Sequence, residues 1–386
     1  MPERVNAVKT SFFGKGAVRL LIPELQKMGI RRALLITDRF LYESGAGEKV
    51  GSVLSEAGVE YAVYYNVTPN PTVGVINECI QAALSIQAEL LVALGGGSAI
   101  DTAKAVSIVA AGGGRVEDYE GVDRSERSGI PIAAVNTTAG TGSECTSFYI
   151  VTDPARHTKM TMVDTNCMVS IAVNDIDFMM SMPPKLTAAT GMDALTHAIE
   201  AILSTNATPL TDKDAVWAVQ TIHEYLPRAV RNGMDEEART MMAYAENTAG
   251  MAFSNAGLGM VHAMAHALGG TYNLPHGVCN AVLLPFVLSF NGKQADTRLG
   301  FAKIAAAMGL ERYDAAAVID RIQKLNQELG IMGSLRELKG VRTEDFGHLA
   351  ELALRDSCMK TNPVQPGVQE VVSVYKNAFE GIIFTY

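Results

Sequence analysis

The feature that most constrains the fold of this 386-residue chain is a change in its hydrophobic pattern at Met182-Pro183-Pro184. Before it, short apolar runs alternate with helical patterns. The clearest runs are residues 32–38, 61–65, 90–94 and 130–136. Continuous apolar strands separated by helices predict a parallel sheet covered by helices on both faces.

After that point we find almost no strand-like alternation, and helical periodicity continues to the end of the chain. The clearest helical patterns are residues 214–230, 236–253 and 315–329. We therefore predict an α/β domain with a parallel sheet over residues 1–182 and an all-α domain over residues 183–386.

Composition excludes several classes of partner. The net charge of -9, without a cluster of Lys and Arg, argues against a nucleic-acid surface. The longest apolar stretches, such as residues 281–288, are far shorter than a membrane span, and residues 1–9 contain no apolar segment typical of a secretion signal. The five cysteines are scattered and odd in number, as expected of reduced thiols. We expect a cytoplasmic protein that binds neither nucleic acid nor membrane.

Histidines are few and concentrated. Three of the seven, His262, His266 and His276, fall within one short window, and His197 follows Asp193 by four residues. Residues four apart share one face of a helix. A carboxylate and several imidazoles suit a borderline divalent ion, and an ion would remove the cost of an unpaired carboxylate in an apolar helix. Taken singly, each histidine could instead be a hydrogen-bonded residue of the core and not a metal ligand.

The remaining histidines, His157, His223 and His348, lack such neighbours in the sequence, and we expect them to be structural or exposed.

Two strand ends carry features that suit a nucleotide. Gly95-Gly96-Gly97-Ser98 follows one apolar run and begins a helical pattern, so its backbone N–H groups suit a pyrophosphate. The same glycines occur about as often in a tight strand-to-helix turn that binds no ligand. Asp38 ends another apolar run, where an acid can bind the ribose hydroxyls of NAD and repel the phosphate of NADP. The alternative for Asp38 is an N-cap of the next helix.

A third polar loop, residues 136–144, follows the apolar run at 130–136. It offers hydroxyl groups and glycines, although it equally suits a loop that caps a helix. Open α/β sheets bind ligands at the carboxyl ends of their strands, and all three loops fall at such ends. The sequence therefore predicts a dinucleotide site in the first domain.

Long motifs resemble those of the iron-containing (group III metal-dependent) alcohol dehydrogenases, a family that includes lactaldehyde reductases, 1,3-propanediol dehydrogenases and bacterial methanol dehydrogenases. The motifs are residues 69–71, 95–101, 137–144, 182–192, 191–200 and 257–277. The resemblance covers nearly the whole chain. It implies an NAD(H)-binding domain followed by a helical, metal-binding catalytic domain, and a homodimer or higher homo-oligomer.

The resemblance also assigns roles to residues. It implies one divalent metal, Fe(II) or Zn(II), held by Asp193, His197, His262 and His276, with His266 as a catalytic residue that does not bind the metal. The implied cofactor-binding residues are Asp38, Asn70, Gly96, Gly97, Ser98, Asp101, Thr137, Thr138, Thr146 and Lys159. Candidate substrate contacts are Ser147, Phe148, Phe253, Cys358 and Lys360.

We accordingly expect an NAD-dependent, metal-dependent alcohol dehydrogenase or aldehyde reductase acting on a short-chain primary alcohol or aldehyde. Ser147, and Lys360 and Val364 in the stretch 358–364, depart from the family pattern. These departures bear on the choice of substrate and not on the reaction class. One alternative is a reductase of a small anionic aldehyde such as sulfoacetaldehyde, attracted by Lys360; the other interpretation of Lys360 is a surface lysine. A second alternative is a non-redox lyase similar to dehydroquinate synthase, although the Lys/Arg density it needs is missing.

Overall fold

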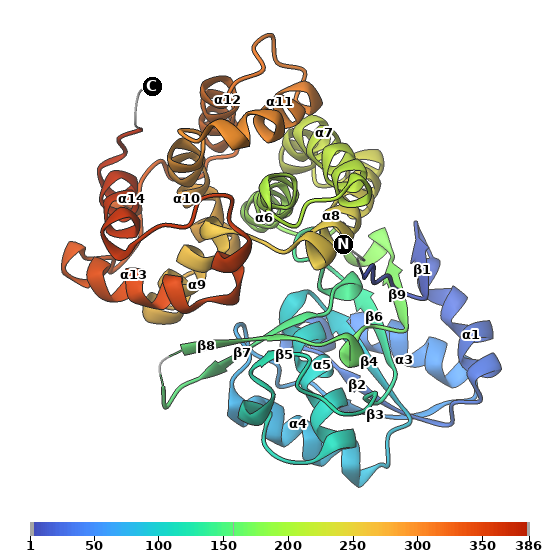
Figure 1. Ribbon diagram of the computed structural model, residues 1–386. Helices are drawn as coiled ribbons and strands as arrows, with labels where there is room; N and C mark the ends of the chain where they lie inside the picture. Colours follow the sequence, from blue (N-terminus) through green and yellow to red (C-terminus); the bar gives the residue numbers. More distant parts are fainter. Residues whose placement is uncertain (1–3, 157, 384–386) are drawn as a thin grey trace. The chain divides into compact units, whose positions relative to one another are not determined.

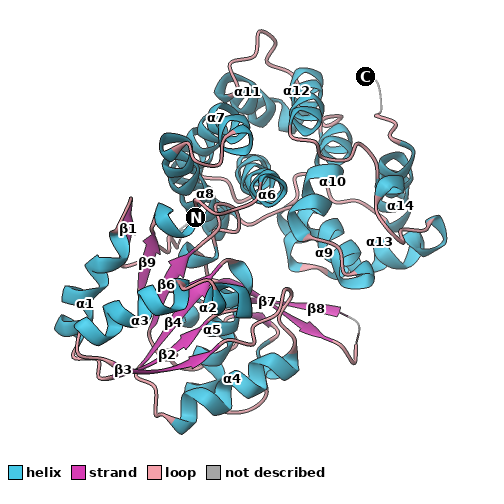
Figure 2. Cartoon of the chain, turned by 180° about the vertical axis from the view of Figure 1, so that it is seen from behind, coloured by secondary structure: helices cyan, strands magenta, loops and turns pink. Residues whose placement is uncertain are grey.

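A computed structural model describes residues 4–156 and 158–383, and the chain divides into two compact units. The first unit is Val5–Ser181 and the second begins at Met182, where the hydrophobic pattern of the sequence changes. All strands in the described residues belong to the first unit, and the second is built of helices and loops (Figure 2). An α/β unit with a parallel sheet is thus followed by an all-α unit, as predicted.

The first unit contains a six-stranded sheet in which every neighbouring pair is parallel. The strand order is β1 (Thr10–Phe13), β9 (Ile171–Asn174), β6 (Ile132–Asn136), β4 (Leu90–Gly95), β2 (Arg32–Ile36) and β3 (Glu60–Tyr64). The four predicted strands are confirmed as β2, β3, β4 and β6, with small differences at their ends. The two that prediction missed, β1 and β9, have only four residues each.

Side chains of the central strands alternate between two cores, because successive residues of a strand point to opposite faces. Ala33 and Leu35 of β2 pack with α1 (Leu21–Met28) and α3 (Ala46–Glu56). Leu34 and Ile36 pack with α4 (Val73–Ser85) and α5 (Gly97–Gly112) on the other face (Figure 1). The strands are buried on both faces, which explains why their sequences are continuously apolar.

A second, three-stranded sheet was not predicted. It has the order β5 (Gly121–Val122), β8 (Thr158–Val163) and β7 (Phe148–Asp153), and β7 and β8 pair antiparallel. Tyr149 and Val151 of β7 join the core on the α4–α5 face, and their neighbours on the strand are only partly buried. This hairpin packs against α5 and α4, the helices that cover that face of the six-stranded sheet.

The second unit is organised around α6, which is buried along almost its whole length and packs against α7, α8 and α10. The predicted helical segments lie within α7, α8 and, apart from its last residue, α12. The helices are α6 (Pro184–Leu203), α7 (Pro209–Arg231), α8 (Glu236–Ala256), α9 (Met260–Tyr272), α10 (His276–Asn291), α11 (Arg298–Ala307), α12 (Ala315–Glu328), α13 (Phe346–Arg355) and α14 (Val368–Glu380). No helix in the described part of the chain is long and apolar enough to cross a membrane.

Candidate functional site

Three helices of the second unit bring the predicted metal ligands together. Asp193 lies on α6, His262 on α9, and His276 is the first residue of α10. Their ligand atoms all lie within 4.8 Å of one another. The distance from Asp193 Oδ1 is 3.7 Å to His262 Nε2 and 3.5 Å to His276 Nε2. One carboxylate oxygen and two imidazole nitrogens so placed suit a divalent ion such as Fe(II) or Zn(II).

The fourth predicted ligand, His197, lies beside this group. Its ring stacks on the ring of His262 with 4.5 Å between centroids, and on the ring of Phe253 at 4.3 Å. Phe253, a candidate for substrate contact, is buried against a predicted metal ligand. The structure therefore places three predicted ligands in one group and the fourth, His197, beside it, outside the set of ligand atoms that lie within 4.8 Å of one another.

A glycine permits the close approach of α10 to α6. A Cβ atom on Gly277 would lie 2.3 Å from the carbonyl oxygen of Ala189, a contact that side chains do not make. Because the obstacle is backbone, only movement of a whole helix would relieve it. Gly277 thus keeps His276, its neighbour in sequence, within reach of Asp193.

The electrostatics of the cluster favour a cation. The imidazole hydrogen bonds and charges around Asp193 lower its pKa although burial opposes ionisation. Burial lowers the pKa of His262, but the carboxylates of Glu200 and Asp193 outweigh burial and raise it to about 9. Two buried carboxylates therefore favour positive charge at this place, and a divalent ion would supply it. The residues present fit a metal centre.

Glu200 is a residue of this site that sequence reasoning missed. Its carboxylate accepts the His262 Nδ1–H at 2.6 Å and the backbone N–H groups of Gly259 and Val261 at 2.9 and 2.7 Å. It therefore caps the beginning of α9 and fixes the tautomer of His262, leaving Nε2 for an ion. The available signal was another buried carboxylate on α6, three residues after His197.

Asp356 is a second residue that was missed. Its Oδ2 accepts a hydrogen bond from His266 Nδ1 at 2.7 Å. Burial raises the pKa of Asp356, but His266 outweighs burial and the pKa falls to about 2. His266 itself stacks on His276 with 5.2 Å between ring centroids, so the predicted catalytic histidine lies next to a predicted ligand. No short sequence pattern links residues 266 and 356.

The thiol of Cys358 completes a second group of donors with His266 and Asp356, again within 4.8 Å of one another. Burial and the neighbouring Asp356 raise the pKa of this thiol well above its usual range. Because a metal binds the thiolate and not the thiol, we interpret this group as a hydrogen-bonded pair with a neutral thiol beside it.

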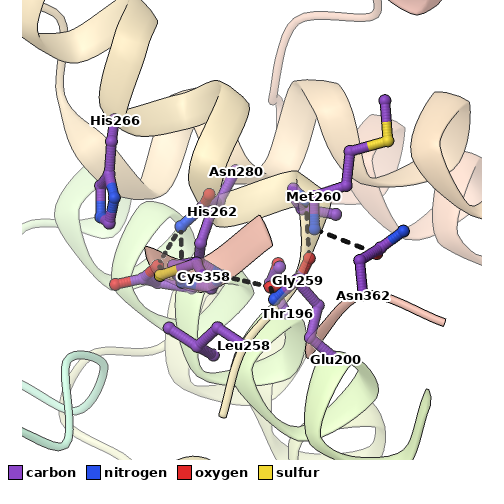
Figure 3. A network of polar contacts seen from close by, with 12 residues as sticks. Thr196, Glu200, Leu258, Gly259, Met260, His262, His266, Asn280, Cys358 and Asn362 are labelled. Atoms are coloured by element: carbon purple, nitrogen blue, oxygen red, sulfur yellow. Dashed lines mark hydrogen bonds and ion pairs between the residues drawn. The ribbon is translucent and has the colours of Figure 1, made fainter. Parts of the chain in front are cut away.

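Asn280 is the third missed residue, and Figure 3 shows it beside His262. Its Nδ2 is 2.6 Å from Asp193 Oδ1 and 3.1 Å from the Nε2 atoms of both His262 and His276. The signal was its position four residues after His276, which repeats the spacing of Asp193 with His197 and of His262 with His266.

In the first unit, the three predicted nucleotide loops follow three neighbouring strands, β2, β4 and β6. Thr37 Oγ1 donates to the carbonyl of Leu94, and the N–H of Thr137 donates to Gly95. A Cβ atom on Gly96 would lie 2.7 Å from Thr138 Oγ1, so the loops after β4 and β6 are packed closely together. Gly96 is the N-cap of α5, and Gly97 and Ser98 form its first turn with partly exposed backbone.

Asp38 is the N-cap of α2 (Arg39–Glu43), the alternative recognised from the sequence. Its Oδ1 accepts the N–H of Leu41 at 2.8 Å. Among the described residues the other oxygen, Oδ2, has no hydrogen bond. Capping through Oδ1 is therefore compatible with the predicted role of Asp38 in binding ribose.

Two further pairs of predicted cofactor residues lie close together. Lys159 and Asn70 are in direct contact, and Asp101 and Thr146 belong to one hydrogen-bond network. Lys159 on β8 donates to Asn70 Oδ1 at 2.7 Å. Asp101 on α5 accepts from Ser143 Oγ and from the N–H of Ile150, and its burial raises its pKa. The fully buried ammonium of Lys104, another missed residue, donates to Ser143 Oγ, Thr146 Oγ1 and the carbonyl of Phe148. Lys104 thereby connects α5 with the loop that carries Thr146.

The other candidate substrate residues fall into two groups. Ser147 is buried and Phe148 is partly buried at the start of β7, in the first unit. Cys358 and Lys360 lie on a short helical turn, Ser357–Thr361, in the second unit. Cys358 is buried beside His266, whereas Lys360 is exposed, which matches the interpretation as a surface lysine.

The histidines outside the cluster have separate surroundings. His223 accepts a hydrogen bond from Arg321 at 2.6 Å, and His348 is exposed on α13. His157 lies outside the described residues.

Comparison with known proteins gives concordant matches. Residues 9–176 match the family described as "Iron-containing alcohol dehydrogenase", and residues 187–379 match "Fe-containing alcohol dehydrogenase family, C-terminal". The chain is 47% identical over 370 residues to "Alcohol dehydrogenase 4" of Schizosaccharomyces pombe, which covers 95% of this chain and 87% of that protein.

Two further matches extend over similar lengths. The chain is 42% identical to the "NAD-dependent methanol dehydrogenase" of Bacillus methanolicus, covering 95% of this chain and 97% of that protein. A crystal structure of a 1,3-propanediol oxidoreductase superposes with a TM-score of 0.94 at 41% identity, covering 98% of this chain and 100% of that one.

Proposed function

Because this chain belongs to the iron-containing alcohol dehydrogenase family, we propose that it interconverts a short-chain primary alcohol and its aldehyde, using NAD(H) and one divalent metal ion, Fe(II) or Zn(II). The observation that carries the proposal is the convergence of Asp193, His262 and His276, whose ligand atoms lie within 4.8 Å of one another.

We assign the two requirements of the reaction to the two units. The unit Val5–Ser181 would bind NAD(H) through the loops after β2, β4 and β6, and through the Asn70–Lys159 pair. The helical unit would hold the ion through Asp193, His197, His262 and His276. Support for the first assignment is the position of the three loops at the carboxyl ends of adjacent parallel strands. Assembly into a homodimer or higher oligomer and a cytoplasmic location remain predictions.

When bound, the metal lowers the pKa of an alcohol or polarises an aldehyde carbonyl, and NAD(H) takes up or supplies the hydride. The protein orients the groups that surround this chemistry. Glu200 accepts the Nδ1 proton of His262, which directs Nε2 of that ring toward the cluster. Phe253 covers one face of His197 and excludes water there.

Proton movement is assigned to His266. Asp356 accepts the Nδ1–H of its ring, so Nε2 is the atom that accepts or delivers a proton. The pKa of Asp356, lowered to about 2, keeps this carboxylate ionised throughout the neutral range. Asp356 therefore holds the His266 ring in one orientation through Nδ1.

The two alternatives have less support. An anionic aldehyde such as sulfoacetaldehyde was suggested by Lys360, which is an exposed residue on the turn Ser357–Thr361. A lyase similar to dehydroquinate synthase is not favoured, because the matched relatives are alcohol dehydrogenases.

The test is reduction of a panel of short aldehydes by NADH, with the protein reconstituted separately with Fe(II) and Zn(II). We expect NADH absorbance to fall with at least one short, uncharged aldehyde, and the activity to disappear after chelation. Sulfoacetaldehyde in the same panel tests the first alternative. If neither metal supports oxidation of NADH by any aldehyde, the proposed function is wrong.

A further inference from the structure

We propose that Asn280 is a further ligand of the metal centre, which binds the ion through its carboxamide oxygen. The inference deepens the proposed function and rests on the metal centre assigned there. Asn280 is fully buried on α10, one turn after His276 and on the same face of the helix.

The first argument is distance. One terminal atom of the Asn280 side chain lies 2.6 Å from Asp193 Oδ1 and 3.1 Å from the Nε2 atoms of His262 and His276. With metal–ligand bonds of about 2.0–2.2 Å, two ligands of one ion lie roughly 3 Å apart. The Asn280 atom therefore stands at the separation expected of a ligand that shares an ion with these three atoms.

The second argument concerns the other terminal atom. Asn280 Oδ1 is buried and has no hydrogen-bond partner among the described residues. Buried carbonyl oxygens normally accept a hydrogen bond. Because Oδ1 accepts none, no contact of Oδ1 favours the orientation in which Nδ2 faces Asp193. The orientation is not anchored at Oδ1.

The third argument is charge. An amide NH₂ group is only a donor, and its hydrogens would face a cation held by Asp193, His262 and His276. The amide oxygen has two lone pairs and is a normal ligand for a divalent ion. A half turn about the Cβ–Cγ bond exchanges the two terminal atoms with almost no change in shape. With an ion among the three ligands, the orientation that directs oxygen to the ion has the lower energy.

The competing interpretation is that Asn280 acts only through a hydrogen bond from Nδ2 to Asp193. The two roles differ in coordination number, which can be measured without turnover. We would replace Asn280 by leucine, which has a similar shape and no donor or acceptor. Asn326→Leu is the matched control, because Asn326 is also buried, donates to the carbonyl of Ala281 on the same helix, and lies outside the metal cluster.

Zn(II) affinity by chelator competition and the visible absorption of Co(II)-substituted protein are the readouts. We expect Asn280→Leu to weaken Zn(II) binding at least tenfold and to change the Co(II) bands toward the stronger absorption of a lower coordination number. Asn326→Leu should change neither. An unchanged Co(II) spectrum in Asn280→Leu, or an equal loss in Asn326→Leu, overturns the inference.

A second measurement needs no variant. In a crystal structure of the unmodified protein with Zn(II) bound, we expect Asn280 Oδ1 within about 2.3 Å of the ion. An ion held by Asp193, His262 and His276 while the amide nitrogen still faces Asp193 would overturn the inference and leave the proposed function intact. Unmodified protein that binds neither Zn(II) nor Fe(II) would overturn both.

Discussion

At the scale of single residues, the site depends on pairing two buried imidazoles with carboxylates. His262 is paired with Glu200 and His266 with Asp356, at 2.6 and 2.7 Å. In both pairs the carboxylate holds Nδ1, which leaves Nε2 as the chemically available nitrogen. The two histidines differ in what their surroundings offer, because His262 is also next to Asp193 and His266 is not.

The first prediction separates ligand from proton carrier. His276→Ala should lose bound metal and nearly all turnover, because it removes one of the converging ligands. His266→Ala should retain metal and slow turnover by about 10²-fold, the range typical of a general acid or base. Metal content by elemental analysis and kcat with a short aldehyde check both. Metal lost from His266→Ala and kept in His276→Ala would reverse the assignment.

The second prediction follows from the pKa of His262, which Glu200 and Asp193 raise to about 9 against the effect of burial. An imidazole must lose its proton to bind a metal, so protons compete with the ion below pH 9. Apparent Zn(II) affinity should therefore fall by about tenfold per pH unit from pH 9 to pH 7. Chelator competition at three pH values checks this. An affinity that does not change over that range contradicts it.

At the scale of elements, α9 begins in the interior and its first N–H groups need partners there. Glu200 accepts from Gly259 and Val261, and Asn362 accepts from Met260. A Cβ atom on Gly259 would lie 2.8 Å from Glu200 Oε1, so the glycine admits this capping carboxylate. Capping of α9 and orientation of His262 are thus performed by one side chain of α6.

The third prediction therefore concerns Glu200. Glu200→Gln should lower the free energy of unfolding by about 1–3 kcal/mol, because a buried amide now faces N–H donors. It should also weaken metal binding by about 10–100-fold, as loss of an orienting partner does elsewhere. Urea unfolding and chelator competition measure the two effects. Glu351→Gln, at an exposed position of α13, is the control and should change neither.

The pattern of the sequence predicted the strongly periodic elements and not the others. Residues 90–94 are apolar without interruption because β4 is buried on both faces, and this pattern is easy to recognise. The hairpin of β7 and β8 packs against α5 and α4 and is buried only at alternate residues, so its apolar pattern is weaker. Its two strands were missed for that reason.

The candidate site was predicted where its residues lie one helical turn apart. Asp193 and His197 form such a pair, and so do His262 and His266. Asp356 was missed because it meets His266 only through the tertiary fold, 90 positions along the chain. Glu200 was missed because a buried carboxylate gives a metal signal only when its hydrogen-bond partners are known.

At the scale of the whole molecule, the chain has two compact units, and each contains one set of predicted residues. All the candidate NAD(H) residues lie between Asp38 and Lys159, and all the candidate metal ligands between Asp193 and His276. Each set is held by hydrogen bonds within its own unit. Substitutions in one set should therefore leave the binding property of the other set unchanged.

The last prediction tests this separation together with cofactor choice. In the unmodified enzyme the carboxylate of Asp38 should favour NAD(H) over NADP(H), since the phosphate of NADP(H) would meet a second negative group. Asp38→Gly should narrow or reverse the ratio of kcat/KM for the two cofactors while bound metal remains the same. Glycine also removes the N-cap of α2, which costs only a few tenths of a kcal/mol relative to Asp, so folding should survive.

Asp314→Gly, which removes an N-cap from α12 in the other unit, is the matched control and should not alter the ratio of kcat/KM for the two cofactors. Equal kcat/KM for NADH and NADPH in the unmodified enzyme would contradict the role of Asp38, and loss of metal from Asp38→Gly would contradict the separation of the two sites.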